Sequence, residues 1–115
     1  MKEVVAIIRP QCWKATKAAL QEIGITGSTQ HRVYGRGRQT GLRYLKPGTK
    51  EILGVSYIPK RMVHVMVADK DVNRVIDVLL RVNRTPAFGD GKIYVCPVED
   101  AIRISTQEAG HLALA

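Results

Sequence analysis

The chain contains the same pattern twice: a short apolar run followed by a segment with helical periodicity. This repeat restricts the possible folds more than any other feature of the sequence. Residues 4–8 are continuously apolar and are followed by Arg9 and Pro10, which is typical of a strand buried on both faces. Residues 62–67 form a second strand-like run. Each run therefore begins a predicted strand–helix unit.

The two helices are predicted over residues 12–23 and 70–82. Gly24 follows the first helix, where a left-handed terminating residue is needed. Asp69 is the predicted N-cap of the second helix, and Asp71 lies in its first turn, where the helix dipole favours an acid. The positions at helical spacing are Trp13, Thr16, Leu20 and Ile23 in the first helix and Val72, Val75, Ile76, Leu79 and Val82 in the second.

Residues 25–34 and 92–98 complete the pattern as further strands. The order strand, helix, strand, strand, helix, strand implies a ferredoxin-like α/β sandwich of the α+β type, with both helices on one face of an antiparallel sheet. We expect residues 1–115 to form a single domain, with a loose tail over residues 107–115.

Two helices cover only one face of such a sheet. The first and third strands lack the polar alternation that a solvated second face requires. We therefore expect the second face to be buried against other copies of the chain in a closed homo-oligomer. The pattern alone does not give the number of copies.

A long polar segment, residues 36–59, separates the second and third strands, and it has no periodicity of a buried element. Connections of this length are uncommon unless they bind something or are disordered. Residues 35–60 contain one acidic residue, Glu51, and six basic residues: Arg36, Arg38, Arg43, Lys46, Lys50 and Lys60. With a net charge of +8, the chain is expected to meet an anionic partner: nucleic acid, a membrane surface, a phosphorylated small molecule or an acidic protein.

Two glycine clusters could bind such an anion. Glycines on both sides of Asp90 allow backbone N–H groups to converge into a nest, and Lys92 adds a point charge suited to phosphate. Gly35 and Gly37 form the second cluster, and Lys60, Arg38 and Arg103 would add donors for a triphosphate. Each cluster is also compatible with a plain turn on a solvated basic surface.

The remaining candidates have structural interpretations. We expect Cys12 and Cys96 to be reduced packing residues. His31 and His111 are expected to be solitary and solvated, and His64 to be a packed or interface histidine. Glu99 and Asp100 would point to opposite faces of a strand, which favours a solvated pair over acid–base chemistry. The N-terminus does not resemble a secretory signal and no segment is long and apolar enough to span a membrane, so we expect a cytoplasmic protein.

Five segments, in order along the chain, carry a family resemblance. They are Ile-Ile-Arg-Pro at residues 7–10, Gly-Arg-Gly-Arg-Gln-Thr-Gly at 35–41, Ile-Pro-Lys at 58–60, Gly-Asp-Gly-Lys-Ile-Tyr-Val at 89–95 and Ala-Ile-Arg at 101–103. Together they resemble the PII nitrogen-regulatory signal-transduction family over nearly the whole chain. The resemblance implies a trimer of ferredoxin-like domains with ATP or ADP in the clefts between subunits. It also implies that 2-oxoglutarate binds with Mg and ATP at the base of the long loop.

The resemblance also assigns residues. Those implied for the nucleotide are Ile7, Thr29, Gly35, Gly37, Arg38, Gln39, Phe88, Gly89, Asp90, Gly91, Lys92, Tyr94 and, from the neighbouring subunit, Arg103. Those implied for 2-oxoglutarate are Gln39, Gly41, Lys60 and Gly89, with Gln39 also joining Mg and Lys60 pairing with the distal carboxylate. The loop residues implied for a partner are Arg43, Tyr44, Lys46, Lys50 and Glu51.

The implied function is that of a non-enzymatic sensor of nitrogen, carbon and energy status. Ligand binding would fix or release the loop, which would present itself to a target protein: a nitrogenase component, an ammonium transporter or a nitrogen-metabolism enzyme. No binding to nucleic acid and no insertion into membranes is implied.

The sequence also departs from the family pattern. Ser105 stands where a second Arg is common, Thr85-Pro86 replaces the usual Thr-Gly, and Thr40 replaces a frequent Lys. These changes put triphosphate affinity and ATP/ADP discrimination in question. No tyrosine matches the modified residue at the loop tip of some members, since Tyr44 and Tyr57 are displaced. The missing Arg and the run from Cys96 to Glu99 resemble the nitrogenase-associated branch.

Three alternatives stay open. The chain could be a PII-like sensor of adenylates alone. It could be an RNA-binding module of ferredoxin-like fold, with bases stacked on Tyr34 and Tyr94. It could also be a phosphate-cleaving enzyme that uses Arg38 or Arg103, although no nucleophile and base pair is recognisable.

Overall fold

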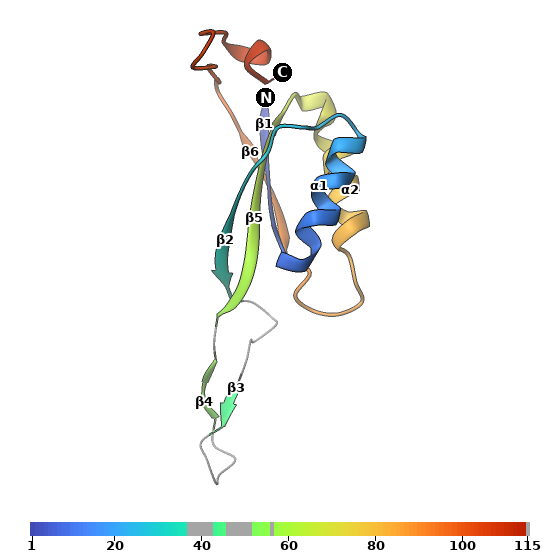
Figure 1. Ribbon diagram of the computed structural model, residues 1–115, viewed down its shortest axis with the longest axis vertical. Helices are drawn as coiled ribbons and strands as arrows, with labels where there is room; N and C mark the ends of the chain where they lie inside the picture. Colours follow the sequence, from blue (N-terminus) through green and yellow to red (C-terminus); the bar gives the residue numbers. More distant parts are fainter. Residues whose placement is uncertain (37–42, 46–51, 56, 115) are drawn as a thin grey trace.

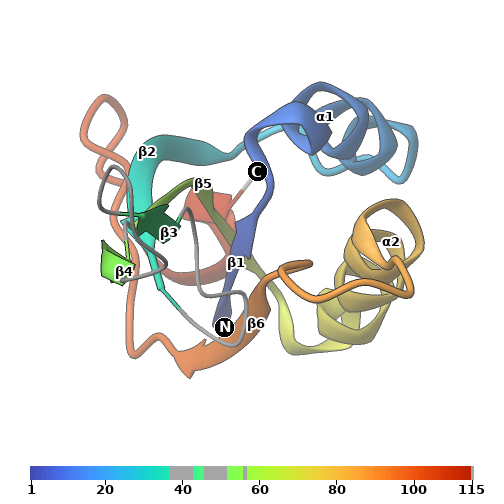
Figure 2. The same cartoon turned by 90° about the horizontal axis from the view of Figure 1, so that it is seen from below.

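A computed structural model describes residues 1–36, 43–45, 52–55 and 57–114. Its main sheet has four antiparallel strands in the order β2 (Thr29–Gly35), β5 (Ile58–Val67), β1 (Lys2–Ile8), β6 (Lys92–Pro97). Helices α1 (Trp13–Glu22) and α2 (Val72–Asn83) lie side by side on one face of this sheet (Figures 1 and 2). The predicted βαββαβ arrangement is confirmed.

The core lies between the sheet and the two helices. Alternate residues of the central strands face the helices, and the register places Val4 opposite Val65. Trp13 packs against this core as a partly buried side chain, as predicted. The buried hydrophobic residues of this core are Val4, Ala6, Ile8, Ala19, Leu20, Val63, Val65, Val67, Val75, Val78 and Leu79.

Both helices begin with a 3-10 turn instead of a side-chain cap: η1 (Pro10–Cys12) precedes α1 and η2 (Asp69–Asp71) precedes α2. The prediction that Asp69 caps α2 is wrong. Its carboxylate lies 3.0 Å from the N-terminal ammonium of Met1, and this hydrogen bond and charge lower the pKa of Asp69. Gly24 follows α1 with a φ of 85°, which confirms its predicted left-handed conformation.

A buried polar contact joins the two helices. Asn83 Nδ2 donates to Thr16 Oγ1 at 3.1 Å and to the Leu79 carbonyl at 3.0 Å. The Thr16 hydroxyl in turn donates to the Cys12 carbonyl at 2.7 Å. Thr16 and Asn83 are 0% and 6% exposed, so this chain of hydrogen bonds is shielded from water.

The segment 36–59 differs from the predicted loop without secondary structure. Within it, β3 (Arg43–Leu45) pairs with antiparallel β4 (Ile52–Val55). β5 already begins at Ile58, where it pairs with Gly35 of β2. Backbone pairing needs no apolar periodicity, so the sequence pattern did not reveal these strands.

The tail also has more structure than expected. Ile102 forms an isolated antiparallel bridge with Ala109, and η3 (Gly110–Leu114) is a 3-10 helix. The carboxylate of Asp100 accepts hydrogen bonds from the Ala101 and Gly110 amides at 2.8 and 3.1 Å. Glu99 and Asp100 are both exposed, as predicted, but Asp100 closes this turn of chain.

The second face of the sheet carries neither α1 nor α2 (Figure 2). The register puts Glu3 and Met66, and likewise Val5 and Tyr94, opposite each other on this face. Met66 and Tyr94 are 47% and 46% exposed in a single chain. Among the described residues, no helix has the length and apolar character needed to cross a membrane.

Candidate functional site

A cleft of about 590 Å³ lies where β2 ends, β5 begins, β1 ends and β6 begins. Antiparallel pairing brings these four strand ends to the same end of the sheet, the end from which β3 and β4 extend (Figure 1). The lining residues are Ile7, Gly35, Arg36, Ile58, Lys60, Ala87, Phe88, Gly89, Asp90, Gly91, Lys92 and Tyr94. Residues from four of the five motif segments therefore meet in one cavity.

The turn of residues 85–91, which connects α2 to β6, forms one wall of the cleft. The Asp90 carboxylate accepts hydrogen bonds from the Thr85 amide at 2.7 Å and from the Thr85 hydroxyl. These bonds, with the hydrogen bond and charge of Arg9, lower the pKa of Asp90 to about 2. Asp90 therefore stays ionised and serves the internal structure of the turn.

Arg9 holds the same turn from the end of β1. Its guanidinium donates through one nitrogen to Asp90 Oδ1 at 2.6 Å and through the other to the Phe88 carbonyl at 2.8 Å. Arg9 is not among the site residues predicted from the sequence. An arginine directly after a buried strand was the available signal, but it does not identify a partner 81 positions away.

Lys60 connects β5 to this wall. Its side chain is largely buried, with the residue 8% exposed, and Nζ donates to the Gly89 carbonyl at 2.6 Å. Burial, and to a lesser degree the positive charge of Arg9, lowers the pKa of Lys60. A cationic group is thus fixed inside the cleft, next to the glycine turn.

The glycines of the turn have conformations that other residues adopt only under strain. Gly89 and Gly91 have φ values of 94° and 108°. A Cβ on Gly91 would lie 1.6 Å from the Ile7 carbonyl oxygen, so no side chain fits there. The turn is thereby packed against β1, and glycine on each side of Asp90 leaves room for an anion to approach the backbone.

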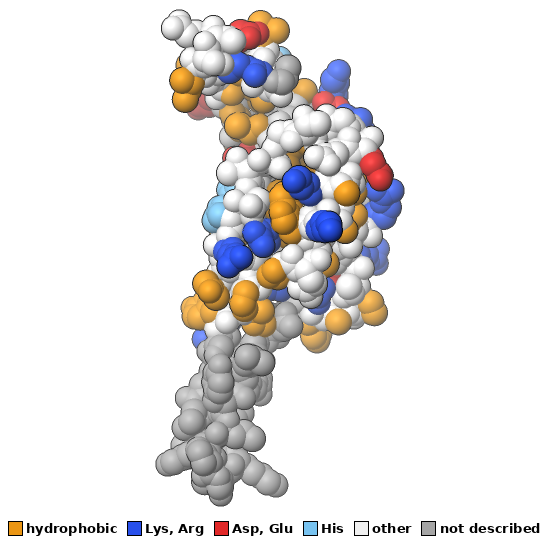
Figure 3. Space-filling model, viewed as in Figure 1, with side chains coloured by type: hydrophobic (Ala, Val, Ile, Leu, Met, Phe, Trp, Pro, Cys, Tyr) orange, Lys and Arg blue, Asp and Glu red, His pale blue; other side chains and the backbone are white. Residues whose placement is uncertain are grey.

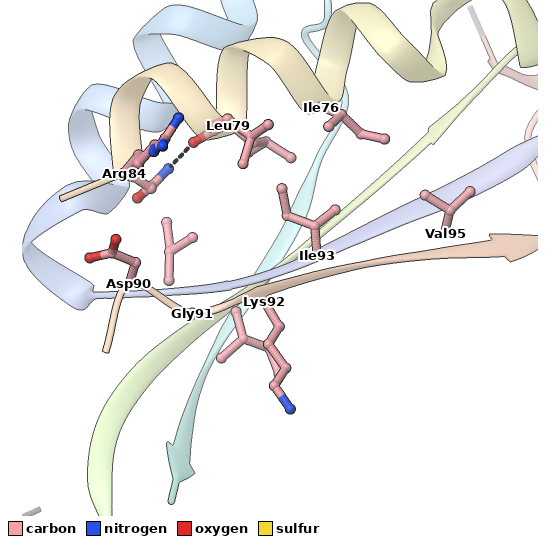
Figure 4. Close-up of a pocket in the computed structure, with 12 residues that line it drawn as sticks. Ile76, Leu79, Arg84, Asp90, Gly91, Lys92, Ile93 and Val95 are labelled. Atoms are coloured by element: carbon pink, nitrogen blue, oxygen red, sulfur yellow. Dashed lines mark hydrogen bonds between the residues drawn. The ribbon is translucent and has the colours of Figure 1, made fainter. Parts of the chain in front are cut away.

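A second cavity, of about 350 Å³, lies on the helix side of β6 (Figure 4). Ile76, Leu79 and Ile93 contribute aliphatic walls, and Asp90, Gly91 and Lys92 line both cavities. Figure 4 shows the side chain of Ile93 pointing toward α2 and that of Lys92 pointing away from it. Lys92 is therefore directed to the side of the sheet opposite the helices.

The structure brings together the predicted residues Ile7, Gly35, Phe88, Gly89, Asp90, Gly91, Lys92, Tyr94 and Lys60. It does not bring Thr29 or Arg103 to the same cleft: Thr29 is the first residue of β2 and pairs with His64, away from the end of β2 that reaches the cleft, and Arg103 follows β6. Arg43 and Tyr44 belong to β3. The predicted residues outside the described part of the chain are Gly37, Arg38, Gln39, Gly41, Lys46, Lys50 and Glu51.

The other candidate groups do not form a metal site. Among described residues, no three His, Cys, Asp or Glu side chains cluster in a way that could hold a metal ion. Cys12 and Cys96 are free, as predicted. His31 is exposed but not solitary, which corrects the prediction: its ring stacks on His64 with centroids 5.3 Å apart. His64 is packed, as predicted, with Nδ1 3.7 Å from Glu3 Oε2.

Basic side chains are spread over the folded surface and are not confined to the cleft. Figure 3 shows Lys and Arg at several places on one face, with fewer acids among them. The net charge of +8 therefore raises the potential over the whole molecule, and it adds a general attraction for anions to the specific contacts of the cleft.

Comparison with known proteins identifies relatives along the full chain. The family described as nitrogen regulatory protein P-II matches residues 1–108. A "nitrogen fixation nifHD region GlnB-like protein 2" of Methanothermobacter marburgensis is 44% identical over 121 residues, covering 99% of this chain and 100% of the relative. The protein of the same description from Methanobacterium ivanovii is 41% identical and covers 99% of both. A nitrogen regulatory protein P-II of Bradyrhizobium diazoefficiens is 42% identical over 110 residues, covering 96% of each.

Proposed function

Because this chain belongs to the nitrogen regulatory protein P-II family, we propose that it binds ATP or ADP in the cleft at the end of its sheet and signals through residues 36–59. As a P-II protein it is a regulatory signal protein and not an enzyme. One observation carries the ligand proposal: a glycine turn with two residues at positive φ lies in one cleft with Lys60 and Lys92. Backbone amides and two ammonium groups suit a polyphosphate.

A homotrimer would complete this site. Thr29 and Arg103 lie outside the cleft of their own chain, which supports their contribution to the cleft of a neighbouring protomer. The sheet face without helices, with Met66 and Tyr94 about half exposed, supports burial against other copies. A heterologous contact that closes after three copies would join one chain's turn to the next chain's Arg103.

We also propose 2-oxoglutarate as an effector, with Mg carried by the nucleotide. Lys60 is fixed in the cleft beside Gly89, which supports a role in binding a carboxylate. Gln39 would join Mg and the oxoacid. A divalent ion between polyphosphate and oxoacid would offset their mutual repulsion, so the two anions should bind synergistically.

The signal would pass to a target protein through Arg43, Tyr44, Lys46, Lys50 and Glu51. Relatives whose descriptions refer to the nifHD region of nitrogen fixation support a nitrogenase component as the target, with an ammonium transporter or nitrogen-metabolism enzyme as the other candidates. A cytoplasmic setting fits this role.

Calorimetric titration tests the proposal. We expect ATP and ADP to bind, AMP to bind less tightly because it offers fewer phosphates to the cleft, and 2-oxoglutarate to bind only in the presence of Mg and ATP. A protein that takes up no adenylate, or is monomeric at micromolar concentration, would contradict the proposal. Adenylate binding without any response to 2-oxoglutarate would instead identify the adenylate-only sensor.

The RNA-binding alternative loses its support in the arrangement of the aromatic side chains. Tyr34 of β2 pairs with Pro59 of β5. Tyr94 of β6 pairs with Val5 of β1, and Val5 pairs in turn with His64 of β5. Residues 59 and 64 of one strand point to opposite faces, so the two tyrosines do not share a stacking surface.

A further inference from the structure

We propose that Arg9 and Asp90 form a positioning pair that holds the glycine turn in its anion-binding shape without contacting the anion. The inference rests on the proposed function, because it concerns the same cleft. It assigns Asp90 a role different from that of a nucleotide ligand, and it gives Arg9 a role in the site.

The hydrogen bonds carry the argument. Both oxygens of the Asp90 carboxylate are engaged within the protein: Oδ1 by Arg9 and the Thr85 hydroxyl, and Oδ2 by the Thr85 amide. A carboxylate would repel a polyphosphate, and these contacts offset its charge with a guanidinium. Asp90 therefore ties the start of the turn to its end.

Arg9 makes two contacts that only a forked cation can make at once. One nitrogen donates to Asp90 and the other donates to the Phe88 carbonyl. The second contact ties the backbone of the turn to the end of β1. The Arg9 side chain is only 17% exposed, so its position is fixed. Since Gly91 also packs directly on the Ile7 carbonyl, the turn is pinned to the end of β1 at both Phe88 and Gly91.

The chain offers a matched control. Arg74 makes the same two kinds of contact, to the Asp71 carboxylate at 3.0 Å and to the Ile23 carbonyl at 3.0 Å, but it lies on α2 outside the cleft lining. Arg9→Met and Arg74→Met remove the same charge and the same number of hydrogen bonds. Only the first should change anion binding if the pair acts through the turn.

Binding of inorganic tripolyphosphate and of Mg-free ATP to the full chain tests the proposal. We expect Arg9→Met and Asp90→Asn each to weaken both ligands about tenfold, with Arg74→Met unchanged. Arg9→Lys should retain part of the affinity, because it keeps the charge but loses one of two contacts. The double variant should be no weaker than either single variant, since the pair acts as one unit.

Asp90→Asn is the decisive variant. If only net charge governed affinity, removal of a negative charge beside the site would strengthen anion binding, whereas loss of a positioning contact weakens it. Tighter or unchanged binding by Asp90→Asn, or equal losses in Arg9→Met and Arg74→Met, would overturn the proposal.

Amide hydrogen exchange separates this proposal from the proposed function, because it needs no ligand. The Thr85 amide donates to Asp90 Oδ2, so its exchange should accelerate in Arg9→Met and not in Arg74→Met. If the unaltered protein bound neither anion, the proposed function would fail. Whether or not the protein binds an anion, an unchanged exchange rate of the Thr85 amide in Arg9→Met would refute the positioning role.

Discussion

Asp90 is an acid in the wall of a site proposed for anions, and its environment explains why it can remain there. Hydrogen bonds from Thr85 and the charge of Arg9 stabilise its ionised form and lower its pKa to about 2. The carboxylate thus contributes to the structure of the turn, and the guanidinium of Arg9 offsets its charge.

This pKa shift predicts how stability depends on pH. The folded protein protonates Asp90 near pH 2, and the unfolded chain near pH 4, so the contribution to stability is complete above about pH 4 and is lost as pH falls toward 2. We expect Asp90→Asn to melt at a lower temperature than the unaltered protein at pH 7. Thermal melting should show this difference shrink between pH 4 and pH 2, and a constant difference would contradict the prediction.

Gly91 gives the sharpest prediction for a single residue. An alanine there would place its Cβ 1.6 Å from the Ile7 oxygen at a φ of 108°. We expect Gly91→Ala to lower the free energy of unfolding by at least about 3 kcal/mol, measured by urea denaturation. Gly27→Ala is the control, because no atom beyond residues 26–28 lies within 4 Å of the added Cβ, and it should leave stability nearly unchanged.

Part of the site could be predicted from the sequence. Gly35 ends β2, and Gly89, Asp90, Gly91 and Lys92 lie in or directly after the turn that leads into β6, so the strand ends that periodicity locates bring these residues to one cleft. The roles of Arg9 and Thr85 were missed, since hydrogen bonds between residues far apart in sequence depend on side-chain geometry that no local pattern contains.

Among the elements, α1 and α2 are joined by a chain of buried hydrogen bonds through Thr16 and Asn83. Thr16→Val keeps the shape of the side chain but removes the acceptor for Asn83 and the donor to Cys12. Because Thr16 and Asn83 are both buried, we expect a loss of about 1–3 kcal/mol in the free energy of unfolding. Substitution of Asn83 should cost less in the Thr16→Val background than alone; equal costs in the two backgrounds would show that the contacts are independent.

The types of the predicted elements were right and several of their ends were wrong. The apolar stripe of α2 identified the helix, but Asp69 pairs with the N-terminal ammonium of Met1 instead of capping it. Local propensity suggests that Asp69 caps the helix. The pairing of Val67 with Lys2, however, places the N-terminal ammonium of Met1 beside Asp69, and the carboxylate binds this ammonium instead of a helix amide. β3 and β4 were missed because strands paired through the backbone need not show apolar alternation.

At the scale of the whole molecule, the sheet face without helices predicts how copies associate. We expect Met66→Lys to keep the fold, because Glu3 lies opposite and can pair with the new ammonium, but to lose the proposed trimer, because assembly would bury that charge. Light scattering after gel filtration measures the outcome. Ala18→Lys, exposed on α1, should remain trimeric, and a trimeric Met66→Lys would place the interface elsewhere.

The sheet order has a further consequence for synthesis of the chain. β6, the last strand of the sheet in the sequence, pairs with β1, the first. The hydrogen bond between Arg9 and Asp90 likewise joins residues 81 positions apart. A growing chain on the ribosome can form α1 and pair β2 with β5, yet the turn of residues 85–91, which forms one wall of the cleft, is not held against β1 until residues beyond 92 have left the exit tunnel. An unfinished chain therefore lacks the complete cleft, and a ligand that needs the whole cleft can bind only to the finished protein.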